Sequence, residues 1–474
     1  MPNTSNHSME RTVKKIVVKF GGSVLKEPSD FKKILSAVRS YSQYLIIVVS
    51  ALYGVTDKLS CFLKKGVFNK KSIDNIIEYL KELHFTFINI NIDKKSSSNE
   101  IRRKILILLK QLKNYLTGLQ LISDVPDFSH SYVLSFGERL SSNLISLFLN
   151  HYGIVNSVAL PEKIGLYSYD SSDRSGVDFN RSIDSVKKNL SPEKNYIIPG
   201  FYGISEGSRI SVFGRGGSDY TAASIAKCID AEFLDLWKDV EGFMTSDPKI
   251  VKEVKPIEHL SYEEAAELSY FGAKIIHPGA FIPIKERNIE LRIFGLGDIS
   301  GKYSPATVIN SKRSVVKDVI KSITYDNDIS ILRLKGANVG EKPGIIAVVS
   351  KKFNKAGINI KSIITSQTSI NFLLSTEDIR ESFKILENIE SFILEEISII
   401  DNISILAAVG EGIGERFGIA SKILSALNKE KINVRIISLG ASETSMYLII
   451  DDSDCKKALT AIHKEFFNRI KDKK

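Results

Sequence analysis

Short apolar runs and amphipathic stretches alternate along residues 14–310. The runs, such as KIVVKF at 15–20, have the length and β-branched content of buried strands. The stretches between them, such as DFKKILSAVRSY at 30–41, repeat apolar residues every three or four positions, as a helix that buries one face does. This alternation predicts an α/β fold, an open and mainly parallel sheet with helices on both faces. The expected strands cover residues 15–20, 44–50, 154–160, 196–201, 209–213, 231–237 and 289–295.

Two stretches depart from this alternation. Residues 62–130 are rich in Lys and Leu and contain no strand-like run, so we expect a helical lobe inserted over one edge of the sheet. Residues 1–13 are polar and lack the apolar core of a secretion signal, so we expect a disordered extension. A single large domain is therefore predicted over 14–310.

The last third of the chain contains an internal repeat with an offset of 74 residues. Ile329–Leu332 aligns with Ile403–Leu406, and three glycines align in the same register, Gly336, Gly340 and Gly344 with Gly410, Gly414 and Gly418. Each copy reads as strand, Gly-containing loop, amphipathic helix and further strands. We expect two α+β units, at 320–395 and 400–474, whose Gly-rich loops leave backbone amides free for a small ligand.

Composition and charge narrow the class of protein. Of the 474 residues 43% are hydrophobic and 25% charged, as in a globular protein, and no apolar run reaches 18 residues, so no membrane partner is expected. Three scattered cysteines without a metal-ligand pattern predict a cytoplasmic protein with no bound metal of its own. The net charge of +10 is compatible with binding of nucleic acid or of an anionic substrate. Because positively and negatively charged residues are mixed along the chain, we favour a solvated surface without a nucleic acid partner.

The first candidate site is Lys19-Phe-Gly-Gly-Ser23 at the end of the first strand. Two glycines let backbone amides approach a phosphate, and the lysine supplies a positive charge for it. A plain Gly-Gly turn between strand and helix is the alternative. The fingerprints of P-loop nucleotidases and dinucleotide-binding folds are absent from the sequence.

Two further motifs open predicted helices. In Gly214-Arg-Gly-Gly-Ser-Asp219, three glycines form a backbone nest and Arg215 can bind a carboxylate through two hydrogen bonds, whereas Asp219 could be only a helix cap. In Phe136-Gly-Glu-Arg-Leu140, Glu138 could face an ammonium group or be a solvated first-turn glutamate.

Two loops complete the candidates. The segment 237–248 (WKDVEGFMTSDP) follows a strand at the carboxyl edge of the sheet, where open α/β sheets bind ligands. The segment 271–278 (FGAKIIHP) offers Lys274 as a second phosphate contact. His277 in that segment is expected to pack or to cap a helix.

These motifs together resemble one family, the aspartate kinases. KFGGS, VVSALYGVTDKL, SFGERLSS, GRGGSDYTA, WKDVEGFMTSDP and FGAKIIHP occur in the order typical of that family, and the similarity extends from Lys14 through the doubled C-terminal unit. The resemblance implies an amino-acid-kinase domain followed by two ferredoxin-like ACT domains. It also implies a monofunctional enzyme that pairs through its ACT domains as a homodimer or tetramer.

The resemblance implies transfer of the γ-phosphoryl group of ATP, with Mg²⁺, to the side-chain carboxylate of L-aspartate. The product would be 4-phospho-L-aspartate, in the first step of lysine, threonine and methionine (diaminopimelate) biosynthesis. The catalytic residues would be Lys19, Asp219 and Lys274. Aspartate would be bound by Ser50, Thr56, Glu138, Arg215 and Ser218. ATP would be bound by Lys19, Gly21, Gly22, Ser23, Lys238, Asp239, Met244, Lys249 and Lys274.

Some positions differ from the commoner pattern of this family. Lys238 stands where Thr is frequent, Met244 where Tyr is frequent, and Lys249 where Arg is frequent. In the first repeat copy, Lys361 occupies a position that is acidic in lysine-inhibited relatives, and it would repel the ammonium group of a bound lysine. The effector could therefore be threonine, or lysine held differently, or there could be none. The candidate effector-binding residues are Gly344, Asn359, Lys361, Ser366 and Gln367.

Two other functions are weighed against this one. A kinase for another small carboxylate is disfavoured by Arg215 and Glu138, which suit an α-amino acid. A catalytically silent amino-acid sensor is disfavoured because every charged residue expected of the active kinase is present.

Overall fold

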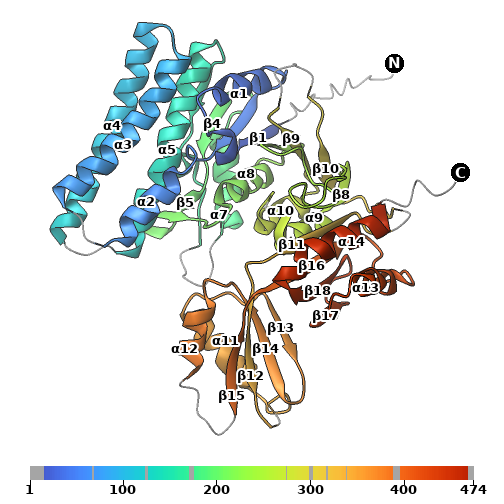
Figure 1. The fold of residues 1–474 in the computed structure, drawn as a ribbon. Coiled ribbons are helices and arrows are strands. Elements are labelled where there is room, and N and C mark those ends of the chain that lie inside the picture. Colours follow the sequence, from blue (N-terminus) through green and yellow to red (C-terminus); the bar gives the residue numbers. More distant parts are fainter. Residues whose placement is uncertain are drawn as a thin grey trace, which may run out of the picture. The chain divides into compact units, whose positions relative to one another are not determined.

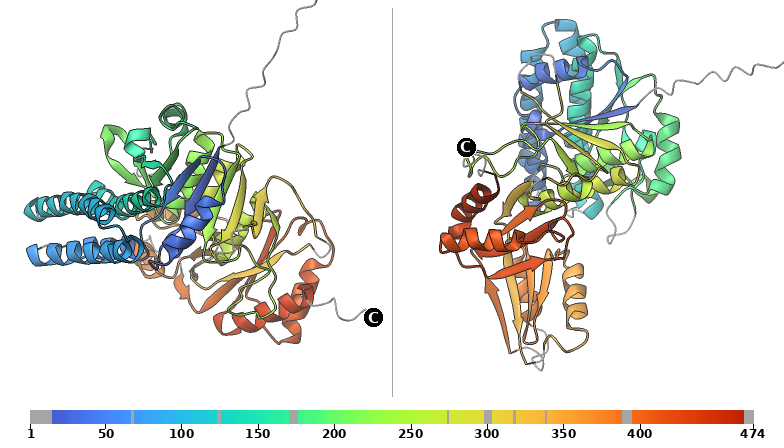
Figure 2. Two further views of the ribbon diagram at one scale, coloured as in Figure 1. Left: turned by 90° about the horizontal axis from the view of Figure 1, so that it is seen from above. Right: turned by 90° about the vertical axis from the view of Figure 1, so that its right-hand side faces the viewer.

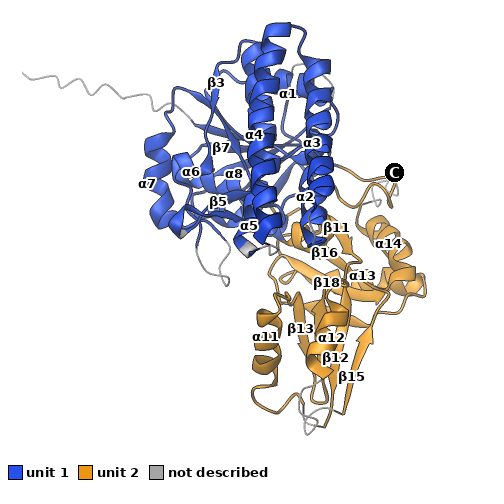
Figure 3. Cartoon of the chain, turned by 90° about the vertical axis from the view of Figure 1, so that its left-hand side faces the viewer, with its two compact units in different colours: residues 1–243, 256–266, 274–312 blue, residues 244–255, 267–273, 313–474 orange. Residues whose placement is uncertain are grey.

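The computed structural model describes residues 15–66, 69–122, 126–169, 176–273, 275–297, 303–316, 319–337, 339–387 and 395–467. The chain forms two compact units (Figure 3), the first built from 1–243, 256–266 and 274–312 and the second from 244–255, 267–273 and 313–474. The expected disordered extension lies outside the described residues.

The first unit is built on an eight-stranded sheet with the strand order β3-β4-β2-β1-β7-β9-β10-β8 (Figure 1). All its strand pairs are parallel except β9 with β10. The mainly parallel sheet predicted from the sequence is therefore confirmed. Its strands are β1 (Ile16–Phe20), β2 (Leu45–Val49), β3 (Asn156–Val158), β4 (Asn195–Pro199), β7 (Phe233–Lys238), β8 (His259–Ser261), β9 (Glu290–Gly295) and β10 (Thr307–Asn310).

The expected strand at 209–213 forms outside this sheet. Its core, β6 (Ile210–Val212), pairs with β5 (Tyr202–Ile204) in a separate two-stranded sheet. Strands β8 and β10 were not predicted. Both are only three or four residues long, too short for a clear hydrophobic period.

Helices cover both faces of the large sheet. Val18 and Ile47 share one core with residues of α1 and α5. Since side chains alternate along a strand, Val17 and Ile46 face the other side, where α8 packs on β1, β2 and β7. The helices of this unit are α1 (Asp30–Arg39), α2 (Val55–Lys64), α3 (Lys70–Asn91), α4 (Lys95–Ile122), α5 (Asp127–His151), α6 (Pro161–Ile164), α7 (Phe179–Asn189), α8 (Gly217–Cys228), α9 (Tyr262–Leu268, which ends in the second unit) and α10 (Phe281–Lys285).

The helical character expected for 62–130 is confirmed. Helices α3 and α4 run side by side (Figure 2) and pack on α5, which itself lies on β2, β3 and β4. The lobe is thus an extra layer over α5 rather than a cover for the edge of the sheet. Apolar residues at helical spacing, such as Ile105, Leu109 and Leu112, are buried between these helices.

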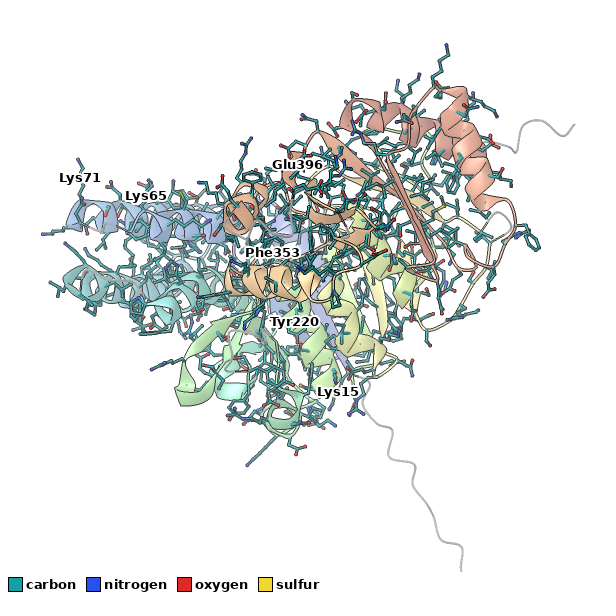
Figure 4. The ribbon with its side chains drawn as sticks, turned by 90° about the horizontal axis from the view of Figure 1, so that it is seen from below. Lys15, Lys65, Lys71, Tyr220, Phe353 and Glu396 are labelled. Atoms are coloured by element: carbon teal, nitrogen blue, oxygen red, sulfur yellow. The ribbon has the colours of Figure 1, made fainter. Side chains whose placement is uncertain are left out.

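The second unit contains two four-stranded sheets, ordered β11-β16-β18-β17 and β13-β14-β12-β15. Its strands are β11 (Ser322–Asp326), β12 (Ser330–Lys335), β13 (Ser362–Thr365), β14 (Ser369–Leu374), β15 (Glu396–Ile400), β16 (Ile403–Val409), β17 (Ile436–Leu439) and β18 (Ser445–Asp451). Its helices are α11 (Ile345–Lys355), α12 (Ile379–Glu387), α13 (Ile419–Lys429) and α14 (Cys455–Phe467). Each sheet carries two of these helices and has its own core. In the core of the β13-β14-β12-β15 sheet, the ring centroids of Phe353 of α11 (Figure 4) and Phe372 of β14 lie 5.9 Å apart.

The boundary expected between the two repeat copies needs a correction. In the 74-residue register, β11 is the first strand of the first copy but pairs with β16 of the second, and β15 is the first strand of the second copy but pairs with β12 of the first. The division into 320–395 and 400–474 therefore cuts one strand from each sheet. The short connections after these strands, 327–329 and 401–402, each pass from one sheet to the other.

Among the residues that the structure describes, no helix is long and apolar enough to cross a bilayer.

Candidate active site

The candidate residues of the first unit gather at the carboxyl ends of neighbouring parallel strands. Lys19 lies near the end of β1, Ser50 follows β2, and Lys238 ends β7. Helix α8 begins at the same edge, because Gly216 turns the chain with a φ of 69°. The α/β arrangement thus brings residues more than two hundred positions apart in the sequence to one edge, as the sequence predicted.

A buried ion cluster occupies this edge. The Lys19 ammonium forms an ion pair with Oδ1 of Asp219, and the Lys238 Nζ lies 3.1 Å from Oδ2 of the same carboxylate. All three side chains are buried. Burial would raise the pKa of Asp219, but the two ammonium groups outweigh it and lower this pKa to about 2. The cluster carries one net positive charge, which suits an anionic ligand.

Lys19 is the most perturbed member of the cluster. Burial lowers its pKa to about 8, and the second ammonium, that of Lys238, acts in the same direction, while Asp219 opposes both. A β-carbon on Gly21 would lie 3.0 Å from the Lys19 Nζ. A side chain at position 21 would therefore crowd the Lys19 ammonium group. This close approach explains why the first residue after KF in the KFGGS motif is a glycine.

Glu138 lies at the same edge in the middle of α5, which begins at Asp127, so the expectation that its motif opens a helix is wrong. Its Oε1 accepts a hydrogen bond from the backbone N–H of Ala51, at 3.2 Å, whereas its buried Oε2 meets no hydrogen-bond donor in the described part of the chain. Burial raises the pKa of Glu138 to about 8, against the attraction of Lys19. A buried carboxylate with an unsatisfied oxygen is a receptor for a cationic ligand group.

The remaining candidates for aspartate binding differ in their surroundings. Ser218 is buried at the start of α8 against Gly200, where a β-carbon would lie 2.8 Å from that of Ser218. Thr56 and Ser50 are partly buried, and the Ser50 carbonyl accepts a hydrogen bond from the Ser141 hydroxyl at 2.6 Å. Arg215 is exposed on the loop before α8.

The candidate nucleotide residues separate into three groups. Gly21, Gly22, Ser23, Lys238 and Asp239 lie at the carboxyl edge of the first unit, with Asp239 exposed. Met244 and Lys249 belong to the second unit, where the Met244 carbonyl accepts a hydrogen bond from Ser322 Oγ at 2.7 Å. Lys274 lies outside the described residues.

Sequence reasoning missed the partnership of Lys238 with Asp219. The resemblance implies Lys238 as a nucleotide contact and Asp219 as a catalytic residue, and it does not pair the two. The available signal was the position of Lys238 at the end of a strand next to β1. His277 behaves as expected: its Nδ1 accepts the backbone N–H of Gly279 at 3.2 Å and caps a short helix (Pro278–Ala280).

In the second unit, the candidate effector residues do not form one cluster. Lys361 precedes β13, and its Nζ contacts Asp326 Oδ2 at 2.8 Å and the Asp328 carbonyl at 2.6 Å. Ser366 and Gln367 follow the other end of β13, where Gln367 donates to Glu341 at 3.1 Å. Gly344 caps α11 and Asn359 is exposed. The positive charge of Lys361 is thus balanced by the Asp326 carboxylate. Lys361 should therefore repel the ammonium group of a bound lysine less strongly than the sequence alone predicts.

Comparisons with known proteins identify the family. The model of the amino acid kinase family matches residues 14–295, and that of an ACT domain matches residues 406–466. The chain belongs to the amino acid kinase family.

Its relatives within that family are aspartokinases, as the motifs predicted. The chain is 30% identical over 470 residues to a bifunctional aspartokinase/homoserine dehydrogenase of Buchnera aphidicola, covering 96% of this chain and 57% of the relative. It is 29% identical over 480 residues to the chloroplastic aspartokinase 3 of Arabidopsis thaliana, covering 97% of this chain and 83% of the relative. The crystal structure of E. coli aspartokinase III with aspartate and ADP shares the fold, with a TM-score of 0.81 at 23% identity over 96% of this chain and all of that one.

Proposed function

We propose that this protein is an aspartate kinase that transfers the γ-phosphoryl group of ATP to the side-chain carboxylate of L-aspartate. The products would be 4-phospho-L-aspartate and ADP. The observation that carries the proposal is the buried Lys19–Asp219–Lys238 cluster at the same sheet edge as the unsatisfied carboxylate of Glu138. The aspartokinases among the relatives support it.

The chemistry explains why the site is cationic. An oxygen of the substrate carboxylate forms a bond to the γ-phosphorus while the bond from that phosphorus to the bridging oxygen of ADP breaks. The attacking carboxylate is already ionised, so no general base is needed. The main barrier is the meeting of several negative charges, which fixed cations lower most effectively. Lys19 would lie between the acceptor and the γ-phosphoryl group, and Asp219 would hold Lys19 and Lys238 in position.

Aspartate would be recognised at both ends. The free oxygen of Glu138 would accept hydrogen bonds from the substrate ammonium, and Arg215 would bind the α-carboxylate. Hydroxyl groups of Ser50, Thr56 and Ser218 would complete the contacts. The contacts of Glu138 with the ammonium group and of Arg215 with the α-carboxylate favour an α-amino acid over other small carboxylates.

The nucleotide would lie along Gly21, Gly22, Ser23, Lys238 and Asp239, with Met244, Lys249 and Lys274 as further contacts. Within the described ranges, no group of three or more His, Cys, Asp or Glu side chains could hold a metal ion. Mg²⁺ would therefore be bound through the phosphates of ATP, whose charge it would partly neutralise.

We also propose that the two ACT-like repeats regulate the enzyme and pair between subunits in a homodimer or tetramer. The reaction would open lysine, threonine and methionine biosynthesis, with lysine or threonine as effector. The cytoplasmic location expected from cysteine usage stays a prediction.

The direct test is the formation of aspartyl hydroxamate from purified protein, Mg-ATP, L-aspartate and hydroxylamine, because hydroxylamine traps an acyl phosphate. We expect product with L-aspartate and none with L-glutamate. Lys19→Ala should reduce turnover at least a hundredfold, whereas the control Lys32→Ala, on the exposed face of α1, should not. No hydroxamate with any amino acid would contradict the kinase and favour a silent sensor.

A further inference from the structure

A cavity of about 440 Å³ lies in the first unit, on the face of the large sheet opposite the ion cluster. Trp237 of β7 lines it, whereas Lys238, the next residue, points to Asp219 of α8. Because side chains alternate along a strand, the cavity and the cluster lie on opposite faces. The volume is within the range of small-molecule sites, about 300–1,000 Å³. No residue with a role in the proposed function lines the cavity.

Arg292 of β9 supplies the polar edge of this cavity. Its Nε and Nη2 donate to the two oxygens of Asp235 at 2.7 and 2.8 Å. A guanidinium group has five N–H donors, so three remain, two on Nη1 and one on the outer side of Nη2. The side chain of Arg292 is 20% exposed, which leaves this edge accessible. Two parallel donors on one edge match a pair of neighbouring acceptors on a ligand.

The charges around Arg292 favour neutral acceptors over a carboxylate. Asp235 is fully buried and already forms an ion pair with the guanidinium. Burial raises the pKa of Asp235, and the Glu290 carboxylate, two residues before Arg292 on β9, acts in the same direction. Two carboxylates therefore surround one cation, and they would repel an anionic ligand.

Aromatic rings form the walls of the cavity. Tyr303 lies edge-on to Trp237, with ring centroids 4.8 Å apart, and Phe294 stacks on Trp237 at 4.9 Å. The Tyr41 hydroxyl donates to Asp235 at 2.7 Å and accepts from Trp237 Nε1 at 3.1 Å, so it is held in place. Flat apolar surfaces beside a pair of donors suit a planar heteroaromatic ring.

We propose that this cavity binds a 6-oxopurine base, the guanine or hypoxanthine ring of a nucleoside. Arg292 would donate to O6 and N7, the neighbouring acceptors that arginine also recognises on guanine in DNA. The ring would pack against Tyr303 and Phe294, and the ribose would lie at the exposed rim beside Ser304. Adenine does not fit, because its N6 amino group is a donor where Arg292 also donates. The site is therefore separate from that of ATP in the proposed function.

The fluorescence of Trp237 tests this assignment, because Trp237 is the only tryptophan of the chain. The full chain is titrated with guanosine and with inosine, and calorimetry measures the same Kd values independently. We expect both nucleosides to change the fluorescence saturably, with and without saturating Mg-ADP. Adenosine is the matched control, and benzoate presents two acceptors with a negative charge. In the presence of Mg-ADP, both should bind at least about tenfold more weakly than guanosine.

Two variants alter the cavity. Arg292→Lys keeps the positive charge but loses the paired donors, and Ser304→Phe fills the cavity from its rim. We expect each to weaken the Kd of guanosine about tenfold or more. Arg287→Lys changes an exposed arginine of the same unit and is the matched control, which should leave this Kd within about twofold.

Failure of both guanosine and inosine to bind would overturn the proposal. So would adenosine or benzoate binding as tightly as guanosine, displacement of guanosine by Mg-ADP, or a Kd that neither cavity variant changes. Circular dichroism of each variant checks that the chain is folded, and Ser304→Phe, at an exposed position, decides if Arg292→Lys is unstable. These titrations involve no phosphoryl transfer, so a negative hydroxamate assay would overturn the kinase function and leave the cavity assignment standing.

Discussion

At the scale of single residues, Glu138 makes the pH dependence of aspartate binding testable. Its carboxyl must be ionised to accept the substrate ammonium, and burial raises its pKa to about 8 in the free protein. At neutral pH most of it is therefore protonated, and ionisation has to accompany binding. We expect kcat/KM for aspartate to rise with pH up to about 8.

The basic side of the same profile belongs to Lys19, whose pKa is lowered to about 8 by burial. Loss of its charge should reduce kcat/KM above that pH, so the profile should be a narrow bell with two coupled apparent pKa values. Glu138→Gln should raise the KM for aspartate about tenfold or more and remove only the acid limb. An acid limb that persists in Glu138→Gln would assign it to another group.

The sequence predicted these residues better than their partners. Lys19 and Asp219 stand in motifs that follow predicted strands, so their position at one edge follows from the α/β pattern. Glu138 lies in the middle of α5 and meets this edge where the backbone N–H of Ala51 donates to it. That the Asp219 carboxylate holds Lys238 depends on the distance between a side chain of α8 and one at the end of β7, which no spacing in the sequence encodes.

At the scale of elements, the contact between α5 and the start of α2 positions Glu138. A β-carbon on Gly137 would lie 2.9 Å from Cβ of Ala51 and 3.5 Å from Val55. Gly137→Ala should separate the two segments, cost about 1–3 kcal/mol of stability and raise the KM for aspartate. Gly118→Ala on α4 is the matched control, because nothing lies within 4 Å of its added methyl group and the helix gains up to about 1 kcal/mol. Thermal unfolding and aspartate kinetics of both variants measure the difference.

The exchange of first strands between the repeat copies gives a second prediction at this scale. The fragment 328–401 contains β12, β13, β14 and β15, one complete sheet with α11 and α12. It should fold cooperatively when expressed alone. The fragment 320–395, of similar length, should not, because it loses β15 and carries β11 without its partner β16. Urea unfolding followed by circular dichroism compares them; equal cooperativity would contradict the assigned pairing.

The repeat itself was predictable, and the exchange was not. The 74-residue offset aligns β12 with β16 and α11 with α13, as the glycine register indicated. The same offset relates β11 to β15, but their sequences, SITYD and EISII, share little beyond an apolar pattern. That pattern predicts a strand without specifying which neighbour it pairs with, because the partner is chosen by tertiary packing.

At the scale of the whole molecule, the division into units does not follow the chain order. The segments 244–255 and 267–273 lie within the sequence range expected for the catalytic domain, yet they pack with the second unit. Val251 is buried in the core of that unit with Leu459 and Ile462 of α14. Motif order predicts Lys19 and Asp219 at one sheet edge, where the structure has them, but it cannot show that two of the motifs continue into another core.

Helix α14 holds the segment that carries the proposed nucleotide contacts Met244 and Lys249, and His463 is the residue that tests this role. His463 Nε2 lies 2.9 Å from the hydroxyl oxygen of Thr245, which also accepts the backbone N–H of Lys255 at 3.0 Å. Thr245 stands between the proposed nucleotide contacts Met244 and Lys249. His463→Leu removes the hydrogen bond, so the loop loses an anchor and the KM for ATP should rise roughly three- to tenfold. The KM for aspartate should stay unchanged, since its proposed contacts lie elsewhere.

A rescue variant, His463→Gln, and a control variant, Lys464→Ala, distinguish a role of His463 in positioning the loop from a general loss of stability. His463→Gln can restore a polar partner to Thr245 and should recover most of the ATP affinity, whereas a purely structural role would leave both variants equally impaired. Lys464→Ala, the exposed neighbour on α14, should match the parent. If His463→Leu raises both KM values together, the variant disturbs the fold as a whole. A selective effect on the KM for ATP would support Met244 and Lys249 as nucleotide contacts.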